Sequence, residues 1–228
     1  MIKVFSTYTK DTIFNENNKI IKIQKGGPAF FIEDVFKKNK VNYKINAFDA
    51  NINIRITNGA EKGVLASKPK ERKISKILKN DIILISTVDR EWILPDNLPE
   101  KVKIFLDVQG YVRAARKNSL IYRLNFWDNI FCMKCNDLES KELPKIIIKN
   151  QKKKCLIVTK GSKGIEVYFK NKKYIFNAKK IKVKNAIGAG DTFFAAFTFY
   201  FMKTSSIIQS GNFAIGEVNK FMLKKCYE

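Results

Sequence analysis

The chain has 228 residues, which suits one sizeable domain or one domain with a small appendage, and its 45% hydrophobic content is sufficient for a buried core. It contains no histidine, so Ser-His-Asp and Cys-His triads and histidine metal sites are excluded. Carboxylates, lysines and backbone dipoles remain for chemistry. No apolar run is long enough to span a membrane, and the amino terminus lacks the apolar core of a signal peptide, so we expect a soluble, cytoplasmic protein with no membrane partner.

The net charge is +23, and the stretch 141–184 alone carries 15 lysines and two glutamates. Nucleic-acid binding, attraction of anionic substrates and a general enrichment in lysine each explain such a charge. Lysine, isoleucine and asparagine are abundant along the whole chain, which favours the third interpretation. A nucleic-acid partner is not expected, because the sequence has no arginine-rich segment and no RNP-like aromatic motif.

The amino-terminal half begins with short apolar strands, predicted at 2–7 and 19–24. Gly26-Gly27-Pro28 then opens a helix that is expected to run to Lys38, with the proline in its first turn. Two half-buried strands follow, at 42–48 and 52–56. The turn-forming residues 49–51 are predicted to separate them. These strands are candidates for a small accessory sheet.

From residue 81 the pattern is typical of an α/β protein with a mainly parallel sheet. Compact apolar strands are predicted at 81–85, 102–107 and 155–159, separated by segments long enough for crossover helices. A hairpin over 164–169 and 173–176 and two terminal helices, at 190–202 and 206–225, complete the chain. No linker or repeat interrupts it, so residues 1–228 are expected to form a single domain.

Two of the four cysteines, Cys132 and Cys135, form a C-x-x-C pair. No second pair and no histidine completes a zinc set. The apolar run 130–133 around them predicts a buried strand, where free cysteines behave as small apolar residues. We therefore favour a packing role over a metal or redox role.

The segment Gly188-Ala189-Gly190-Asp191 lies at the start of an apolar helix. Helix starts present unpaired N–H groups and a partial positive charge, and glycines let the backbone approach an anion closely. Asp191 could act as a base on a hydroxyl held beside a phosphate, as phosphoryl transfer requires. Capping of the first turn by the same carboxylate is an equally simple explanation.

The position of this turn in the sheet favours the first interpretation. Ligands of parallel sheets bind beyond the carboxyl ends of the strands. Asp107, the segment 159–161 and the turn at 185–191 all come at or after predicted strand ends. Three polar features are thus expected to meet at one edge of the sheet.

Taken together, these residues resemble the ribokinase-like (PfkB) family of carbohydrate and nucleoside kinases. The resemblance implies a three-layer fold with a mainly parallel central sheet and a small β lid, here drawn from 13–25 and 41–66. The matching segments, in the family's order, are the paired glycines Gly26-Gly27-Pro28-Ala29, the D-x-Q-G-x-x-R run 107–113 of archaeal-type and inositol-kinase-like members, the N-x-x-E element Asn136–Glu139, the V-T-x-G-x-x-G loop 158–164 and the G-A-G-D signature 188–191.

The resemblance also implies roles for these residues in transfer of a phosphoryl group from ATP to a hydroxyl of a sugar, polyol or nucleoside. Asp191 would be the base, the amides of Gly188, Ala189 and Gly190 would form the anion hole, Asn136 and Glu139 would organise Mg²⁺, Thr159, Gly161 and Gly164 would lie along the nucleotide phosphates, and Asp11, Gly26 and Gly27 would contact the acceptor. Simpler explanations stay open: a helix cap for Asn136 and Glu139, a strand-to-hairpin turn for Thr159 and Gly161, and a solvated surface acid for Asp11.

Several departures from the family pattern leave the activity open. Asn185 and Ile187 stand where an acid and a threonine are usual. The αβ unit after the first helix is missing, and the last helix has no clear match to the usual nucleotide-contacting asparagine. A minimal kinase and a catalytically impaired ligand-binding or regulatory protein both fit. Exposed lid strands would allow a homodimer as well as a monomer.

Overall fold

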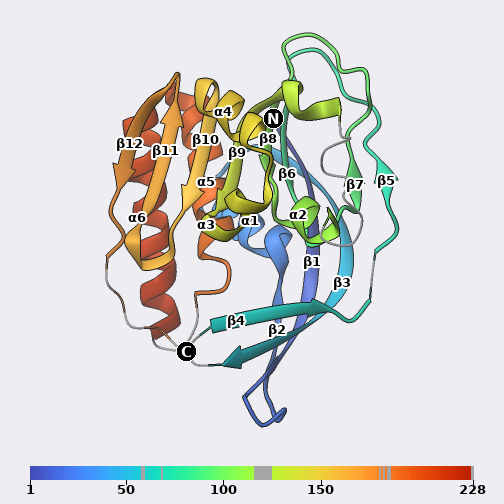
Figure 1. Cartoon of the computed structure of the whole chain (residues 1–228), viewed down its shortest axis with the longest axis vertical. Helices are drawn as coiled ribbons and strands as arrows, with labels where there is room; N and C mark the ends of the chain where they lie inside the picture. The colour runs from blue at the N-terminus through green and yellow to red at the C-terminus, as the bar shows by residue number, and fades with distance from the viewer. Residues whose placement is uncertain are drawn as a thin grey trace.

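The computed structural model describes residues 1–57, 60–67, 69–115, 125–179, 181, 183 and 186–226. Its main element is a sheet in the order β12-β11-β10-β9-β8-β6-β1-β3-β4, with β2 paired to β1 (Figure 1). The parallel part of this sheet consists of β1 (Ile2–Phe14), β3 (Tyr43–Thr57), β6 (Ile82–Ser86), β8 (Lys103–Asp107), β9 (Ile130–Asn136) and β10 (Cys155–Thr159). Their carboxyl ends therefore point toward the same edge, as the apolar runs predict.

Helices cover both faces of the sheet. One face packs against α1 (Gly27–Lys38), α5 (Ala189–Thr204) and α6 (Ile207–Cys226) in a core rich in phenylalanine. The other packs against α2 (Gln109–Ala115), α3 (Asp137–Glu142), α4 (Lys145–Lys153) and the 3₁₀ turn η2 (Asn125–Asn129). The fold is thus three-layered. Within the described residues, no helix combines the length and the apolar character needed to cross a bilayer.

Antiparallel strands close the two ends of the sheet. The hairpin β11 (Ile165–Phe169) and β12 (Lys172–Phe176) pairs with β10 at one end. At the other, β2 (Ile20–Gly26) pairs with β1, and β4 (Ala60–Leu65) pairs with β3. We call β2 and β4 the lid strands, because they extend away from the helices beyond the end of the central sheet (Figure 1).

The predicted break between two strands at 49–51 is wrong, because β3 is continuous. It pairs in parallel with β1 without a gap, from Ile2 opposite Tyr43 to Phe14 opposite Arg55. Ala50 is buried, whereas Asp49 and Asn51 are more exposed. The turn-forming residues therefore fit the alternation of a half-buried strand. The parallel pairing with β3 also carries β1 to residue 14, well past the predicted end at residue 7.

The expected crossover helix between β6 and β8 is also absent: residues 87–102 contain the short strand β7 (Trp92–Ile93), which pairs with β5 (Arg72–Lys73). The side chain of Trp92 covers the part of the sheet that a helix would otherwise cover. The residue is 5% exposed, its ring contacts Phe5 edge-on, and its indole N–H donates to the carbonyl of Ser6. A large aromatic residue can cover this part of the sheet without a helix.

The C-x-x-C pair lies on β9, where Cys132 and Cys135 point to opposite faces of the sheet. Cys132 packs in the core under α5, whereas Cys135 packs in the core on the α4 side. Residues three apart on a strand diverge in this way, because successive side chains alternate between the faces. The two thiols cannot hold one metal ion together, and both serve packing.

The core under α5 gives a test of what stabilises the fold. Phe197 is 0% exposed and stacks between Phe193 and Phe201. We expect Phe197→Ala to lower the free energy of unfolding by about 3–5 kcal/mol, since it removes a ring and leaves a cavity. Phe30→Ala, at a residue that is 39% exposed, is the matched control and should cost clearly less. Equal losses in urea titrations would contradict this account of the core.

Candidate active site

A cleft of about 260 Å³ lies at the carboxyl ends of the central strands. Strands β1, β9 and β10, the starts of α1 and α5, and the extended parts of β3 and β4 supply its walls. Seven of the predicted site residues line it: Asp11, Gly27, Asn136, Thr159, Gly188, Gly190 and Asp191. The structure therefore brings together residues that are up to 180 positions apart in the sequence.

Asp191 lies in the first turn of α5, and its carboxylate does not cap that helix. Gly188 is the N-cap residue, and the Asp191 Oδ1 accepts a hydrogen bond of 3.3 Å from the Ser86 hydroxyl at the end of β6. The pKa of Asp191 is raised to about 6. Burial is the main cause, and the Asp107 carboxylate adds to it, whereas the Lys134 ammonium partly offsets both. A carboxyl in this range is a competent general base near neutral pH.

The backbone before Asp191 presents amides to the cleft. Gly188 adopts φ 91°, and a Cβ there would overlap the ring of Phe31. The Ala189 amide donates to the carbonyl of Ala186 at 3.0 Å. Among the described residues, the amides of Gly188 and Gly190 have no backbone acceptor. Together with the helix dipole, they give this turn the character of an anion site.

A buried lysine, which the sequence analysis missed, lies next to this turn. Lys134 is 4% exposed, and its Nζ is 2.6 Å from the Oδ2 of Asp107. A Cβ on Gly190 would lie 3.2 Å from the same Nζ. Burial lowers the pKa of Lys134, but the carboxylates of Asp107, Asp191 and Glu139 raise it above its ordinary value. The ammonium therefore stays charged at the edge of the anion site.

Two side chains from the D-x-Q-G-x-x-R run, Gln109 and Arg113 of α2, also line the cleft. Arg113 is exposed and forms no ion pair with the described carboxylates. Its charge favours the ionised form of Asp191 and lowers the pKa of that carboxyl.

The signal for Lys134 in the sequence was weak, because this chain is rich in lysine and Lys134 lies inside an otherwise apolar strand.

Asn136 and Glu139 form a capping box at the start of α3, which is the helix-cap role considered above beside a role at Mg²⁺. The Asn136 side chain accepts from the amides of Leu138 and Glu139, and the Glu139 Oε2 accepts from the Asn136 amide at 2.8 Å. Burial and the charge of Asp107 raise the pKa of Glu139. Asn136 lines the cleft and Glu139 supports it from α3. The capping geometry does not exclude a role beside a metal ion, because one Glu139 oxygen lies outside the box.

Thr159 ends β10 and faces the cleft, while Gly161 and Gly164 shape the turn that follows. The turn η3 (Gly161–Lys163) leads directly into β11. Both glycines have positive φ, 56° and 89°. A Cβ on Gly164 would overlap the carbonyl of Phe176, whereas Gly161 faces open space. Gly164 is thus needed for the turn itself, and Gly161 leaves the backbone accessible.

Asp11 is buried in the cleft wall at 2% exposure, so the solvated-acid explanation is wrong. Its carboxylate accepts a hydrogen bond from the Thr9 hydroxyl, and burial raises its pKa. A Cβ on Gly26 would overlap this carboxylate, and one on Gly27 would meet the backbone of Thr7 and Thr9. The paired glycines therefore let the start of α1 approach β1 beside Asp11.

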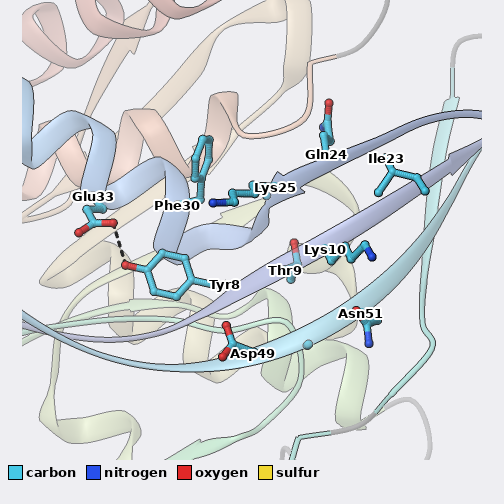
Figure 2. A pocket seen from close by; sticks show the side chains of 12 residues that line it. Tyr8, Thr9, Lys10, Ile23, Gln24, Lys25, Phe30, Glu33, Asp49 and Asn51 are labelled. Carbon is cyan, nitrogen blue, oxygen red and sulfur yellow. Dashed lines mark hydrogen bonds between the residues drawn. The ribbon is translucent and has the colours of Figure 1, made fainter.

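A larger cavity of about 690 Å³ is lined by residues of β1, β2, β3 and α1 (Figure 2). Tyr8 donates a hydrogen bond of 2.8 Å to Glu33 in it, and its other walls combine the charged side chains of Lys10, Lys25 and Asp49 with apolar ones such as Phe30. Of the predicted site residues, only Gly26 reaches this cavity. Asp191 and the α5 turn are absent from its lining, so we place the chemistry in the smaller cleft.

The family model described as pfkB family carbohydrate kinase matches residues 37–216. The chain belongs to the pfkB family. A comparison with curated protein sequences finds no match. The family's fold is confirmed by the three layers, the mainly parallel sheet and the lid strands described above.

Solved structures similar to this pfkB chain include three kinases with different names. A pyrophosphate-dependent kinase in the ribokinase family, bound to a pyrophosphate analog and myo-inositol, has a TM-score of 0.70, 18% identity, and coverage of 94% of this chain and 92% of that one. The nucleoside kinase of Methanocaldococcus jannaschii has a TM-score of 0.69, 20% identity, and coverage of 96% and 90%. Ribokinase of Arabidopsis thaliana, complexed with ribose and ATP, has a TM-score of 0.63, 16% identity, and coverage of 95% and 90%. At these identities the similarity is one of fold.

The departures from the pfkB pattern lie beside the anion site. Asn185 falls outside the described residues. The side chain of Ile187 packs against the apolar cluster of Ile13, Ala50, Ile52, Ile54 and Val88 under the lid strands. Its carbonyl accepts a hydrogen bond of 2.7 Å from Lys225 of α6. Isoleucine here joins the turn to the lid cluster by apolar contact.

The conformation of Gly188 can be tested directly. Gly188→Ala should lower the free energy of unfolding by about 1–3 kcal/mol, because alanine is strained at φ 91° and its Cβ would overlap Phe31. Gly216→Ala is the matched control: this α6 glycine has nothing within 4 Å of an added Cβ. The control should raise stability by about 0.5–1 kcal/mol. Similar effects of the two substitutions in urea titrations would refute the structural role of Gly188.

Proposed function

We propose that this protein transfers the γ-phosphoryl group of ATP to a hydroxyl of a small sugar, polyol or nucleoside. Asp191 removes the hydroxyl proton as the acceptor oxygen bonds to phosphorus, the bond from phosphorus to the ADP oxygen breaks, and ADP leaves. The position of Asp191, in one cleft with Asp11 and with the glycines of the α5 turn, is the observation that carries the proposal. Membership of the pfkB family supports the same reaction class.

The acceptor belongs on the side of the cleft formed by β1 and the lid strands. Asp11 offers a carboxylate to acceptor hydroxyls, and Gly27 lines the same cleft at the start of α1. Ile52 and Ile54 of β3 line the same region. A mixture of one carboxylate and apolar side chains suits a polyhydroxylated ring with one apolar face.

The donor phosphates belong on the side formed by β9 and β10. Thr159 and the accessible backbone at Gly161 would lie along them, and the turn held by Gly164 would keep this backbone in place. The amides at Gly188 and Gly190, with the Lys134 ammonium, would receive the transferring group. Positioning and charge neutralisation of this kind supply most of the catalysis in phosphoryl transfer.

The donor set suits Mg²⁺. The described residues contain no cluster of three or more carboxylate or thiolate groups able to cage a metal, and the ligand-type atom that the capping box leaves over is one Glu139 oxygen. Mg²⁺ is typically held by one or two carboxylates, retained waters and substrate phosphates. Asn136 and Glu139 would organise it through those waters. When bound, it would neutralise charge on the donor phosphates.

Replacement of the base tests the reaction. Asp191→Asn keeps the size of the side chain and removes the basic oxygen, so we expect phosphoryl transfer to fall by about 10²–10⁴-fold with an unchanged circular dichroism spectrum. The assay follows labelled phosphate onto a panel of sugars, polyols and nucleosides. Product at the wild-type level from this variant would exclude Asp191 as the base.

The same panel distinguishes an active kinase from a catalytically impaired binding or regulatory protein. Pyrophosphate is included as a donor beside ATP, because one structurally similar protein is a pyrophosphate-dependent kinase. Tight ligand binding without any phosphorylated product in the wild-type protein would instead support the catalytically impaired binding or regulatory protein that Ile187 and the missing αβ unit suggest. Omission of Mg²⁺ should abolish transfer.

The pH dependence follows from the raised pKa of Asp191. A base must be unprotonated to act, and the pKa is about 6. We therefore expect kcat/KM to rise with pH, to be half-maximal near pH 6, and to fall about tenfold per unit below it. Carbon-13 NMR of labelled aspartates, with Asp191→Asn for assignment, measures the same titration without turnover. A carboxyl that titrates near pH 4 would contradict the prediction.

A further inference from the structure

The Ser86 hydroxyl lies between two carboxylates at the end of β6. Its Oγ is 3.1 Å from the Oδ2 of Asp107 and 3.3 Å from the Oδ1 of Asp191. Ser86 is 0% exposed, and its own carbonyl accepts from the Ser6 hydroxyl at 2.6 Å. A hydroxyl has one hydrogen, so it donates to only one of these carboxylates at a time. Which of them receives it affects the orientation and the charge of Asp191.

Asp107 has other donors for both of its oxygens. Its Oδ1 accepts from the amide of Gln109 at 3.1 Å, and its Oδ2 accepts from the Lys134 Nζ at 2.6 Å. The bond from Lys134 is charge-assisted, and such bonds are roughly twice as strong as neutral ones. Because Lys134 satisfies Asp107, the Ser86 hydrogen is available to Asp191.

The charges that face Asp191 come from several elements. Lys134 of β9 and Arg113 of α2 favour its ionised form, and Asp107 of β8 opposes it. Glu139 of α3 is a further carboxylate near Lys134. Loss of the ammonium would leave Asp107, Glu139 and Asp191 as neighbouring carboxylates, and Arg113 is the cation among the described residues that would still favour their ionised forms. Buried carboxylates in such a group cannot all remain ionised.

We propose that Ser86 and Lys134 are positioning residues for Asp191: Lys134 neutralises Asp107, which leaves the Ser86 hydroxyl to hold the ionised Asp191 carboxylate in place for the acceptor. This inference rests on the proposed role of Asp191 as the base. It assigns a function to a serine that carries no motif and to a lysine in the middle of a hydrophobic strand. A purely structural ion pair would stabilise the fold without affecting Asp191.

Ser86→Ala is the first test. It removes the hydrogen bond to Asp191 and leaves the Lys134–Asp107 pair intact, so we expect kcat/KM to fall about threefold at pH 6.5 and about tenfold well below pH 6. Both losses correspond to an acid limb of the kcat/KM profile that moves up by about one pH unit. The KM values for donor and acceptor should stay within about twofold, since Ser86 does not line the cleft.

Ser6→Ala is the matched control. Ser6 is also a buried serine at 0% exposure, on the neighbouring strand β1, and its hydroxyl donates to a carbonyl and not to a carboxylate. Any effect of removing a buried hydroxyl as such should appear in both variants. The acid limb should move only in Ser86→Ala, and movement of similar size in Ser6→Ala would overturn the assignment.

The role of Lys134 needs a pair of variants, because Lys134→Met leaves Asp107 buried and uncompensated. This single variant should shift the acid limb further than Ser86→Ala. In the double variant Lys134→Met with Asp107→Asn, no second carboxylate competes for the Ser86 hydrogen, and the carboxamide oxygen that replaces the Asp107 Oδ1 can still accept from the Gln109 amide. Because the Lys134 ammonium also borders the anion site, we expect the limiting kcat of the double variant to stay low, while its acid limb returns toward the wild-type position. If the single variant does not fold, the double variant is compared with wild type.

NMR titration of labelled Asp191 makes the test independent of turnover. Its midpoint should rise in Ser86→Ala and in Lys134→Met, and return toward the wild-type value in the double variant. Unchanged midpoints in folded Ser86→Ala and in Lys134→Met would overturn the inference. If wild type transfers no phosphoryl group from any donor while these midpoints move as expected, the proposed function fails and the positioning of Asp191 stands.

Discussion

The buried ion pair between Lys134 and Asp107 holds together the edge of the sheet on which the cleft is built. Both side chains are almost fully excluded from water, at 5% and 0% exposure, and their charged atoms are 2.6 Å apart. Isolated charges at such positions would cost roughly several kcal/mol each, so neither residue is tolerable without the other. The pair lets β8 and β9 carry charged residues near their ends, directly below the start of α5. The turn with Gly188 and Asp191 therefore lies against a buried ion pair.

The second constraint is the long pairing of β1 with β3. β3 runs without a break from the central sheet into the lid region, and the 13 residues of β1 pair with it over their full length. Asp11 therefore lies on the same continuous strand as the core residues Val4 and Phe5. Extending an existing strand places an acidic side chain in the cleft without a new layer of structure.

The parts of the fold that could be predicted are those in which local sequence and tertiary packing agree. Apolar runs located β6, β8 and β10 to within one residue, and the Gly-rich turn before a phenylalanine-rich segment located the start of α5. Asp49 and Asn51 misled the prediction of β3, because turn propensity is local while pairing with β1 is not. Ser86 and Lys134 could not have been found in this way. Their importance depends on distances to residues at least 21 positions away.

Ile187 shows how a departure from the family pattern can be compatible with the proposed chemistry. Its side chain faces the apolar cluster of the lid strands, and its carbonyl is held by Lys225. The polar surroundings of the anion site come from other residues: the amides of Gly188 and Gly190, the Lys134 ammonium and Arg113. A hydroxyl at position 187 would add one neutral hydrogen bond of about 1 kcal/mol, whereas these groups contribute charge in a partly buried cleft. The isoleucine therefore packs the turn against the apolar cluster under the lid strands at little electrostatic cost.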